Sequence, residues 1–297
     1  MTYSRRIALI IFLGAGVFSA LAEPSERQVT RDFRELFATH GSRLPGAPGN
    51  LFLEKHVTKV FAESGFPSGA MTFEAPAFIP GRAAIRAGDQ SFPIQTLHPS
   101  MMRPGNFPER KFNTRLIYFG KADYAAIERL RGVVLRGSVA LVEFDCDMDW
   151  VYLLRFGVKG FIFIGKESYF HQDSVSKLYN TEVSCPRYFI EPEAGARLRQ
   201  LATAAGKNGA DVVIESEPSR WRRQTLHNPW VVIPGSDPEL GKDVIVLTAP
   251  LDARCIVPER ALGIQGAGNL YLLLQLLEHF KENPPARTVV LAAVNAH

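Results

Sequence analysis

The sequence predicts an α/β protein whose sheet is mostly parallel, carries helices on both faces, and is interrupted by an α+β module. Three observations predict this fold class. Residues 244–247 and 288–294 are continuous apolar runs, which is typical of strands buried in a parallel sheet. Residues 270–280 between them are almost wholly apolar and predict a buried helix. Residues 114–219 instead combine short β-like runs with a few helix candidates, which indicates a separate compact module.

The composition is that of an average globular protein. The chain has 297 residues, of which 46% are hydrophobic and 22% are charged. These values exclude a collagen, a disordered tail and a coiled coil, and the length predicts about two domains. The formal charge is only +4 and no basic block stands out, so we expect neither a nucleic-acid partner nor a membrane surface. Three cysteines are too few for a disulfide scaffold, and we expect them to be buried as small apolar residues.

Residues 1–22 have the pattern of an export signal. Arg5 and Arg6 supply a positive start, an apolar run follows, and Ala20-Leu-Ala22 is a small-x-small cleavage pattern. The apolar run is short for a membrane-spanning helix, which needs about 20 residues. We therefore expect a secreted or periplasmic protein with no stable membrane span after cleavage. The alternative is an uncleaved membrane anchor.

Helices, short strands and a linker are expected before and after the module. Amphipathic patterns predict helices at residues 25–40 and 51–64, the second stopped by Gly65. Residues 66–110 are rich in proline and phenylalanine and predict short strands and loops. Residues 220–223 (RWRR) are expected to be a solvated linker rather than a nucleic-acid contact.

Two further patterns are expected to be structural. The glycine loop at residues 263–269 reads G-x-x-G-x-G, which is not the dinucleotide order and has no Walker lysine after it. The acidic cluster of Glu143, Asp145, Asp147 and Asp149 lacks the spacing of a calcium loop. We expect a tight helix entry at the first pattern and a solvated loop at the second.

The order of several motifs resembles one family. The turn at residues 234–238 (PGSDP) precedes the apolar strand, the glycine loop follows, and the helix ends in Leu276-Leu-Glu278. A loop and helix at residues 41–65 precede them. This order resembles the secreted di-zinc aminopeptidases and carboxypeptidases. The strands of the middle region, GSVALVE at 137–143 and FGVKGFIFI at 156–164, resemble a protease-associated domain, which is commonly inserted in that family.

The resemblance implies four segments. They are a signal peptide at 1–22, an N-terminal peptidase-like part at 25–77, an inserted protease-associated-like domain at 78–219, and a continuation of the peptidase-like domain at 220–297. We expect the two peptidase-like parts together to make an incomplete domain with an exposed apolar edge near residues 289–294.

The resemblance also implies where zinc ligands would stand. The family strand ends in His-x-Asp, with histidine as ligand and aspartate as its partner; here Pro250 replaces the ligand and Asp252 is kept. Counting back from Glu278 puts Gly268 at the position of the bridging aspartate. His297 stands at the position of the catalytic base, and the remaining ligands would lie further along the family sequence.

The replaced residues decide the expected function. Zinc is the cofactor by resemblance, but Pro250 and Gly268 supply no ligand, so we expect that this chain does not bind it. The first hypothesis is an exported metallopeptidase-family protein that does not hydrolyse peptide bonds as it stands. The alternative is a non-catalytic relative that binds a peptide or protein through the protease-associated module. A third is an unrelated exported α/β protein.

Overall fold

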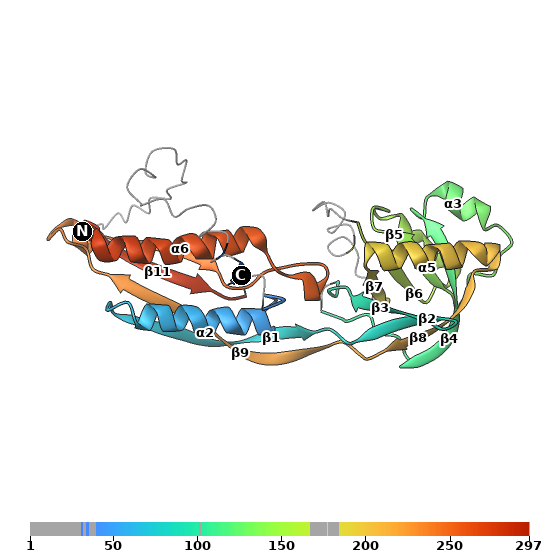
Figure 1. Ribbon diagram of the computed structural model, residues 1–297, viewed down its shortest axis with the longest axis horizontal. Helices are drawn as coiled ribbons and strands as arrows, with labels where there is room; N and C mark the ends of the chain where they lie inside the picture. Colours follow the sequence, from blue (N-terminus) through green and yellow to red (C-terminus); the bar gives the residue numbers. More distant parts are fainter. Residues whose placement is uncertain are drawn as a thin grey trace, which may run out of the picture.

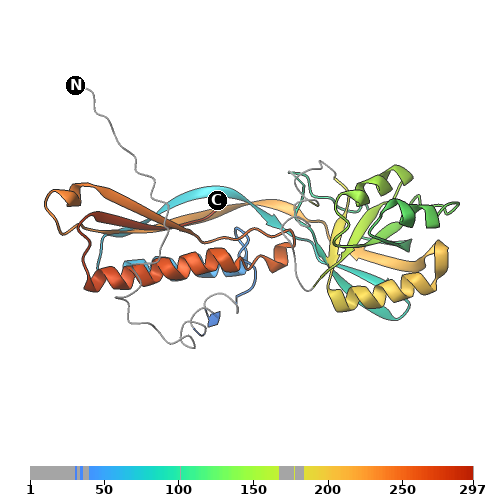
Figure 2. The ribbon, with the colours of Figure 1, turned by 90° about the horizontal axis from the view of Figure 1, so that it is seen from above.

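The protein is elongated, with a sheet unit at one end and a barrel at the other (Figures 1 and 2). The structure is a computed structural model that describes residues 31, 34–35, 40–100, 102–166, 177 and 184–296. The expected leader at 1–22 and His297 lie outside the described residues, as does most of the helix expected at 25–40.

The sheet unit has four strands in the order β1 (Ser68–Ile79), β9 (Arg220–Ile233), β11 (Thr288–Val294) and β10 (Val244–Pro250). Strands β10 and β11 are parallel, as their apolar runs predict. However, β9 pairs antiparallel with both β1 and β11, so the prediction of a mostly parallel sheet is wrong. The reason is the long antiparallel ribbon of β1 and β9: the chain runs along β1 from the sheet to the barrel, and after the barrel it runs back to the sheet along β9.

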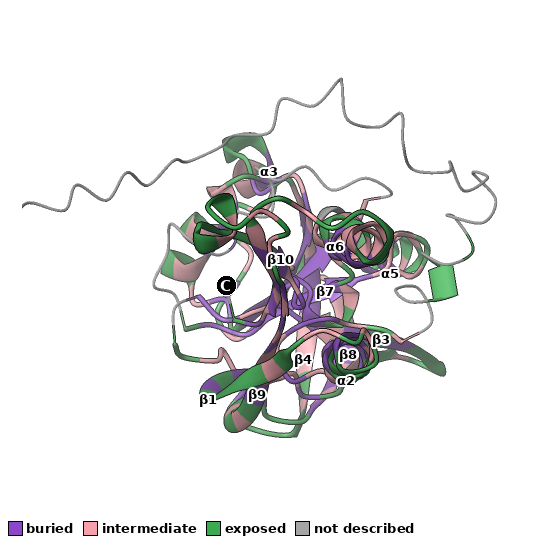
Figure 3. Ribbon diagram, turned by 90° about the vertical axis from the view of Figure 1, so that its left-hand side faces the viewer, coloured by how far each residue is buried: buried purple, intermediate pink, exposed green. Residues whose placement is uncertain are grey.

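Both helices of this unit cover the same face of the sheet. Helices α2 (Pro48–Ala62) and α6 (Ile264–Glu282) share one buried cluster with β9, β10 and β11. Viewed end-on, they lie on one side of the strands (Figure 3). The prediction of helices on both faces is therefore wrong for the described residues. Neither these two helices nor any other helix in the described parts is long and apolar enough to cross a membrane.

Strand β10 is one of the two edge strands of the sheet, and β1 is the other. The sequence predicts an exposed edge near residues 289–294, but β11 is an inner strand paired on both sides. Three consecutive residues of β10 are exposed instead: Val244 by 58%, Ile245 by 39% and Val246 by 59%. An apolar edge without charge or bulge is what native sheets normally avoid, because it can pair with another chain.

The barrel is closed by seven strands between residues 83 and 216. In spatial order these are β2 (Ala83–Ala87), β3 (Gln90–Thr96), β7 (Arg187–Ile190), β6 (Gly160–Ile164), β5 (Val139–Glu143), β4 (Lys111–Gly120) and β8 (Ala210–Ser216). Strands β4 to β7 are parallel to one another, and the other pairings are antiparallel. The short strands are as predicted, whereas closure into a barrel is not visible in the sequence.

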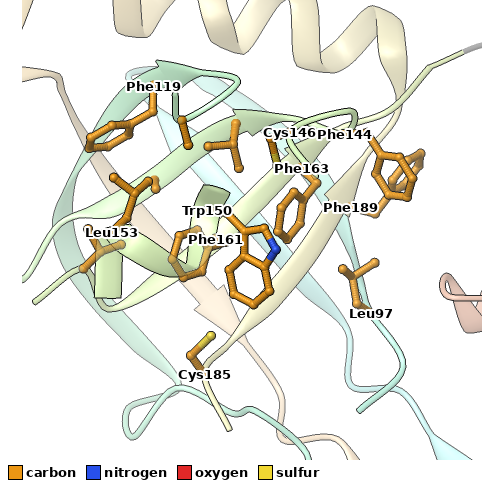
Figure 4. Packing of buried hydrophobic residues seen from close by; sticks show 14 of the residues in the cluster. Leu97, Phe119, Phe144, Cys146, Trp150, Leu153, Phe161, Phe163, Cys185 and Phe189 are labelled. Carbon is orange, nitrogen blue, oxygen red and sulfur yellow. The ribbon is translucent and has the colours of Figure 1, made fainter. Parts of the chain in front are cut away.

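Two apolar layers explain the continuous apolar runs of β5, β6 and β7. Alternate residues of these strands point into the barrel, as Leu141 and Ile162 do, or into a second cluster outside it. In that second cluster Trp150 packs edge-on against Phe161 and Phe163, with ring centroids 5.0 and 5.7 Å away (Figure 4). Because other apolar residues cover both faces of β5, β6 and β7, these strands need not alternate apolar and polar residues.

The remaining short elements follow the sequence with small shifts. Helices α3 (Tyr124–Arg129) and α5 (Pro192–Ala204) lie in the module for which helix candidates are expected. Residues 151–156 lie in the 3₁₀ helix η1 (Asp149–Phe156). The long strand β1 and the first ten residues of β9 are not predicted. Three short 3₁₀ turns complete the fold: η2 (Gly206–Asn208), η3 (Leu240–Lys242) and η4 (Pro258–Arg260).

Aromatic side chains pack together at the neck, the narrow region where β1 and β9 pass from the sheet to the barrel. The ring of Phe78 on β1 lies 5.3 Å from those of both Trp221 and His98, and the Trp221 indole N–H donates to the carbonyl of Met102 at 2.6 Å. His98 also donates its backbone N–H to the carbonyl of Ile256 at 2.7 Å. The prediction of a solvated linker at residues 220–223 is therefore wrong, because Trp221 packs inward while the arginines beside it point outward.

Protonation of His98 is expected to weaken the fold in acid. Burial lowers the pKa of His98 below 6.5, and the charges of Arg187 and Arg254 lower it further. The unfolded chain therefore takes up a proton that the folded chain does not, so the stability present above pH 6.5 falls as the pH drops below it. Urea unfolding of the wild type should lose more free energy than that of His98→Phe between about pH 7 and about pH 5. An equal loss in both proteins would contradict the assignment.

Candidate functional site

The candidate site lies where β10 and β11 end. These strands are parallel and in register, with Pro250 beside Val294, and Leu251 donates its backbone N–H to the carbonyl of Val294 at 2.7 Å. The polar residues that follow, Asp252 and Asn295, are 2% and 5% exposed. In open α/β sheets this is the edge where ligands bind.

Arg43 is the most heavily bonded side chain of the site. It is 1% exposed, and all five of its guanidinium N–H groups have a carbonyl acceptor. The acceptors are the carbonyls of Pro250 at 2.9 Å, Leu251 at 3.1 Å, Asp252 at 3.1 Å, Leu262 at 3.0 Å and Gly263 at 3.0 Å. Burial lowers the pKa of Arg43 to about 10, and the nearby Asp252 opposes that shift, so the group stays charged at neutral pH.

Asp252 connects the ends of the two strands. Its Oδ2 accepts a hydrogen bond from the backbone N–H of Ala296 at 3.1 Å. The carboxylate therefore faces the segment that follows β11, and its charge is opposite to that of Arg43 nearby.

A second network of polar side chains begins at Asn295, the residue that follows β11. Asn50 donates its side-chain N–H to Asn295 Oδ1 at 2.6 Å, and Asn295 in turn donates to Glu54 Oε2 at 2.8 Å. Glu54 Oε2 also accepts the backbone N–H of His227 at 2.8 Å, and its Oε1 lies 2.7 Å from His227 Nδ1. The network joins α2, β9 and the end of β11.

Sequence analysis missed this network, although a signal exists. Asn50 and Glu54 fall on the same helical stripe as the buried Leu53, Val57 and Phe61 of α2. A polar pair on an otherwise apolar stripe indicates buried hydrogen-bond partners, because unpaired polar groups are costly to bury. Which partners they find could not be read from local spacing.

The structure brings a different glycine to Pro250 than the one expected. A Cβ built on Gly266 would lie 3.0 Å from Pro250 Cγ, whereas a Cβ on Gly268 meets nothing within 4 Å. Two residues are about half a helical turn apart, so the two glycines point to nearly opposite sides of α6. Of these two glycines, Gly266 is therefore the one that lies against Pro250.

The described residues do not fit a zinc ion. Pro250 and both glycines offer no side-chain donor, and the Asp252 carboxylate is already bonded to the backbone. Within the described ranges, no group of three histidine, cysteine or carboxylate side chains is placed to hold a metal. Zinc sites need three or four such ligands.

The other charged and sulfur-bearing candidates are structural. Asp145 pairs with Lys121 at 3.0 Å and Lys166 at 2.7 Å, so the acidic cluster is partly neutralised rather than simply solvated. The three cysteines are free. The prediction of buried thiols is confirmed for Cys146 and Cys185, where burial raises the pKa of each to about 11.

Replacing Arg43 should destabilise the protein strongly. In Arg43→Lys the charge is kept, but three N–H donors cannot serve five buried carbonyls, so we expect a loss of about 3 kcal/mol in the free energy of unfolding. Arg222→Lys is the matched control, because Arg222 is exposed and, among the residues that the structure describes, donates only to Gln224. It should change stability by less than about 0.5 kcal/mol. Equal losses in both variants would contradict this role for Arg43.

Comparison with known proteins finds similarity in structure alone. No protein-family model matches the sequence, and no curated protein matches it in a sequence search. The zinc aminopeptidase BSAP from Bacillus subtilis aligns with 91% of this chain at a TM-score of 0.59 and 16% identity. A peptidase M28 precursor from Shewanella amazonensis aligns with 88% at a TM-score of 0.56 and 14% identity.

The chain spans about three fifths of these two structures, 61% and 62% of their respective lengths. At such low identity the similarity concerns the fold. We conclude that over its described length this chain has the fold of zinc aminopeptidases.

Proposed function

We propose that this protein is an exported relative of the zinc aminopeptidases and carboxypeptidases that, as this chain stands, does not hydrolyse peptide bonds. One observation carries the proposal. At the edge where the fold would hold its metal, Pro250 and the glycines of α6 supply no ligand, and Asp252 is bonded to the backbone of Ala296. His297, the candidate base by resemblance, would have no bound metal to act with.

Metal content and activity test the proposal together. The purified chain, dialysed against zinc, should retain well below one equivalent, because a single carboxylate cannot hold the ion. It should release no terminal amino acid from unblocked peptides. One bound equivalent of zinc, together with release that a chelator abolishes, would overturn the proposal.

Export is the second part of the proposal. The leader at residues 1–22 has a positive start, an apolar run and a cleavage pattern at Ala22. We expect the mature protein to begin at Glu23 outside the cytoplasm. N-terminal sequencing of the protein from the culture fluid or periplasm checks this, and an intact leader on that protein would contradict it.

The segment boundaries belong to the same proposal. We assign residues 25–77 and 220–297 to the peptidase-like domain and 78–219 to a protease-associated-like insertion. The closed barrel, whose strands lie between Ala83 and Ser216, supports the inner boundaries.

A second candidate function is binding of a peptide or protein through the barrel. Two observations favour it. The barrel is stabilised by two apolar layers, neither of which includes a residue of the candidate site, and Ile256 and Val257 of the loop after β10 belong to one of them. It also contacts the loop after β10, because Arg260 of that loop pairs with Glu191 of the barrel and stacks over Phe189 at 5.1 Å. A bound partner on the barrel could thereby act on the candidate site.

A further inference from the structure

A shallow groove of about 730 Å³ lies on the outside of the barrel. Its floor is formed by β2, β8 and β4, and one wall is the segment at Arg136 and Gly137. The hydrogen bond from Thr114 Oγ1 to the carbonyl of Gly137, at 2.8 Å, holds that wall against β4. Alternate residues of the same strands, such as Ile85 and Ile214, are buried in the barrel, so the charged side chains of the groove face outward.

Positive charge dominates the groove. Arg86, Lys111, Arg115 and Arg136 line it, with Asp211 as the single acidic lining residue. Glu215 beside the groove pairs with Lys111 at 2.8 Å and with Arg86 at 3.7 Å. The four cations still outnumber the two carboxylates, so the surface attracts anions.

Two of the arginines are placed to bind a ligand. Arg115 donates to the carbonyls of Val134 and Asn208, which orients its guanidinium while its remaining N–H groups stay available. Arg136 is exposed and has no hydrogen bond or ion pair with any residue that the structure describes. An oriented and an unpaired guanidinium along one groove form a pair of carboxylate-binding groups, because the planar fork matches a carboxylate.

We propose that this groove binds an acidic peptide segment, whose carboxylates pair with Arg115 and Arg136. The proposal rests on the second candidate function and names its ligand. No aromatic side chain is among the described residues that line the groove, so it lacks the stacking surface that single-stranded nucleic acids use. The small Gly88 and Gly137 instead leave room for a peptide backbone to approach.

Binding of a fluorescein-labelled, glutamate-rich peptide with blocked ends to the full chain tests the proposal by fluorescence anisotropy. Arg136→Ala should weaken binding about tenfold, because it removes a charged hydrogen-bond donor. Since Arg136 has no described partner, this variant should fold normally, which circular dichroism checks. Arg115→Lys should also weaken binding, because it keeps the charge but loses the fork.

The matched control is Arg223→Ala, which removes one positive charge from an exposed residue on β9 outside the groove. It should leave the affinity within about twofold. A glutamine-rich peptide of the same length should not bind. Equal binding of the two peptides, equal affinities of Arg136→Ala and wild type, or tighter binding of single-stranded DNA would each overturn the proposal. Cleavage of the peptide is followed separately, so hydrolysis contradicts only the proposed lack of catalysis.

Discussion

The buried guanidinium of Arg43 is the interaction on which the arrangement of the site depends. It bonds five backbone carbonyls that lie 207 to 220 residues away in the sequence. These carbonyls belong to both ends of the loop between β10 and α6, which has no regular structure apart from the turn η4. Without those donors, the carbonyls would be buried without partners, which is costly in a low-dielectric interior.

The loop held by Arg43 is also the connection to the barrel. Its Arg260 reaches Glu191, and its Ile256 accepts a hydrogen bond from His98 at the neck. The strands β1 and β9 form the other connection, since they pair along their full twelve-residue register. The two units therefore meet through a two-stranded ribbon and a loop whose other end borders the candidate site.

The polar side chains at this edge of the sheet form their hydrogen bonds within the protein. Arg43, Asp252 and Asn295 all use their polar atoms to satisfy groups within the protein. A catalytic metal centre needs the reverse, with several side-chain donors left to converge on one point. The polar groups of the site are thus hydrogen-bonded to one another, but they offer no set of metal ligands among the described residues. On the barrel, Arg136 shows the opposite condition, because its guanidinium has no hydrogen-bond or ion-pair partner among the described residues.

The sequence by itself determined the local elements and the chemistry that they exclude. The apolar runs of β10 and β11, the helix between them and the short strands of the barrel follow from periodicity, which depends on near neighbours in the chain. That Pro250 and Gly268 carry no metal-binding side chain is likewise a matter of residue type. Only the tertiary structure decided that β9 runs antiparallel in the sheet, that both helices share a face, and that β10 rather than β11 is an edge strand. It also decided that Gly266 rather than Gly268 meets Pro250, and that Arg43 and Asn50 find partners more than 200 residues away. Such pairings depend on how distant elements pack, and local spacing carries no information about them.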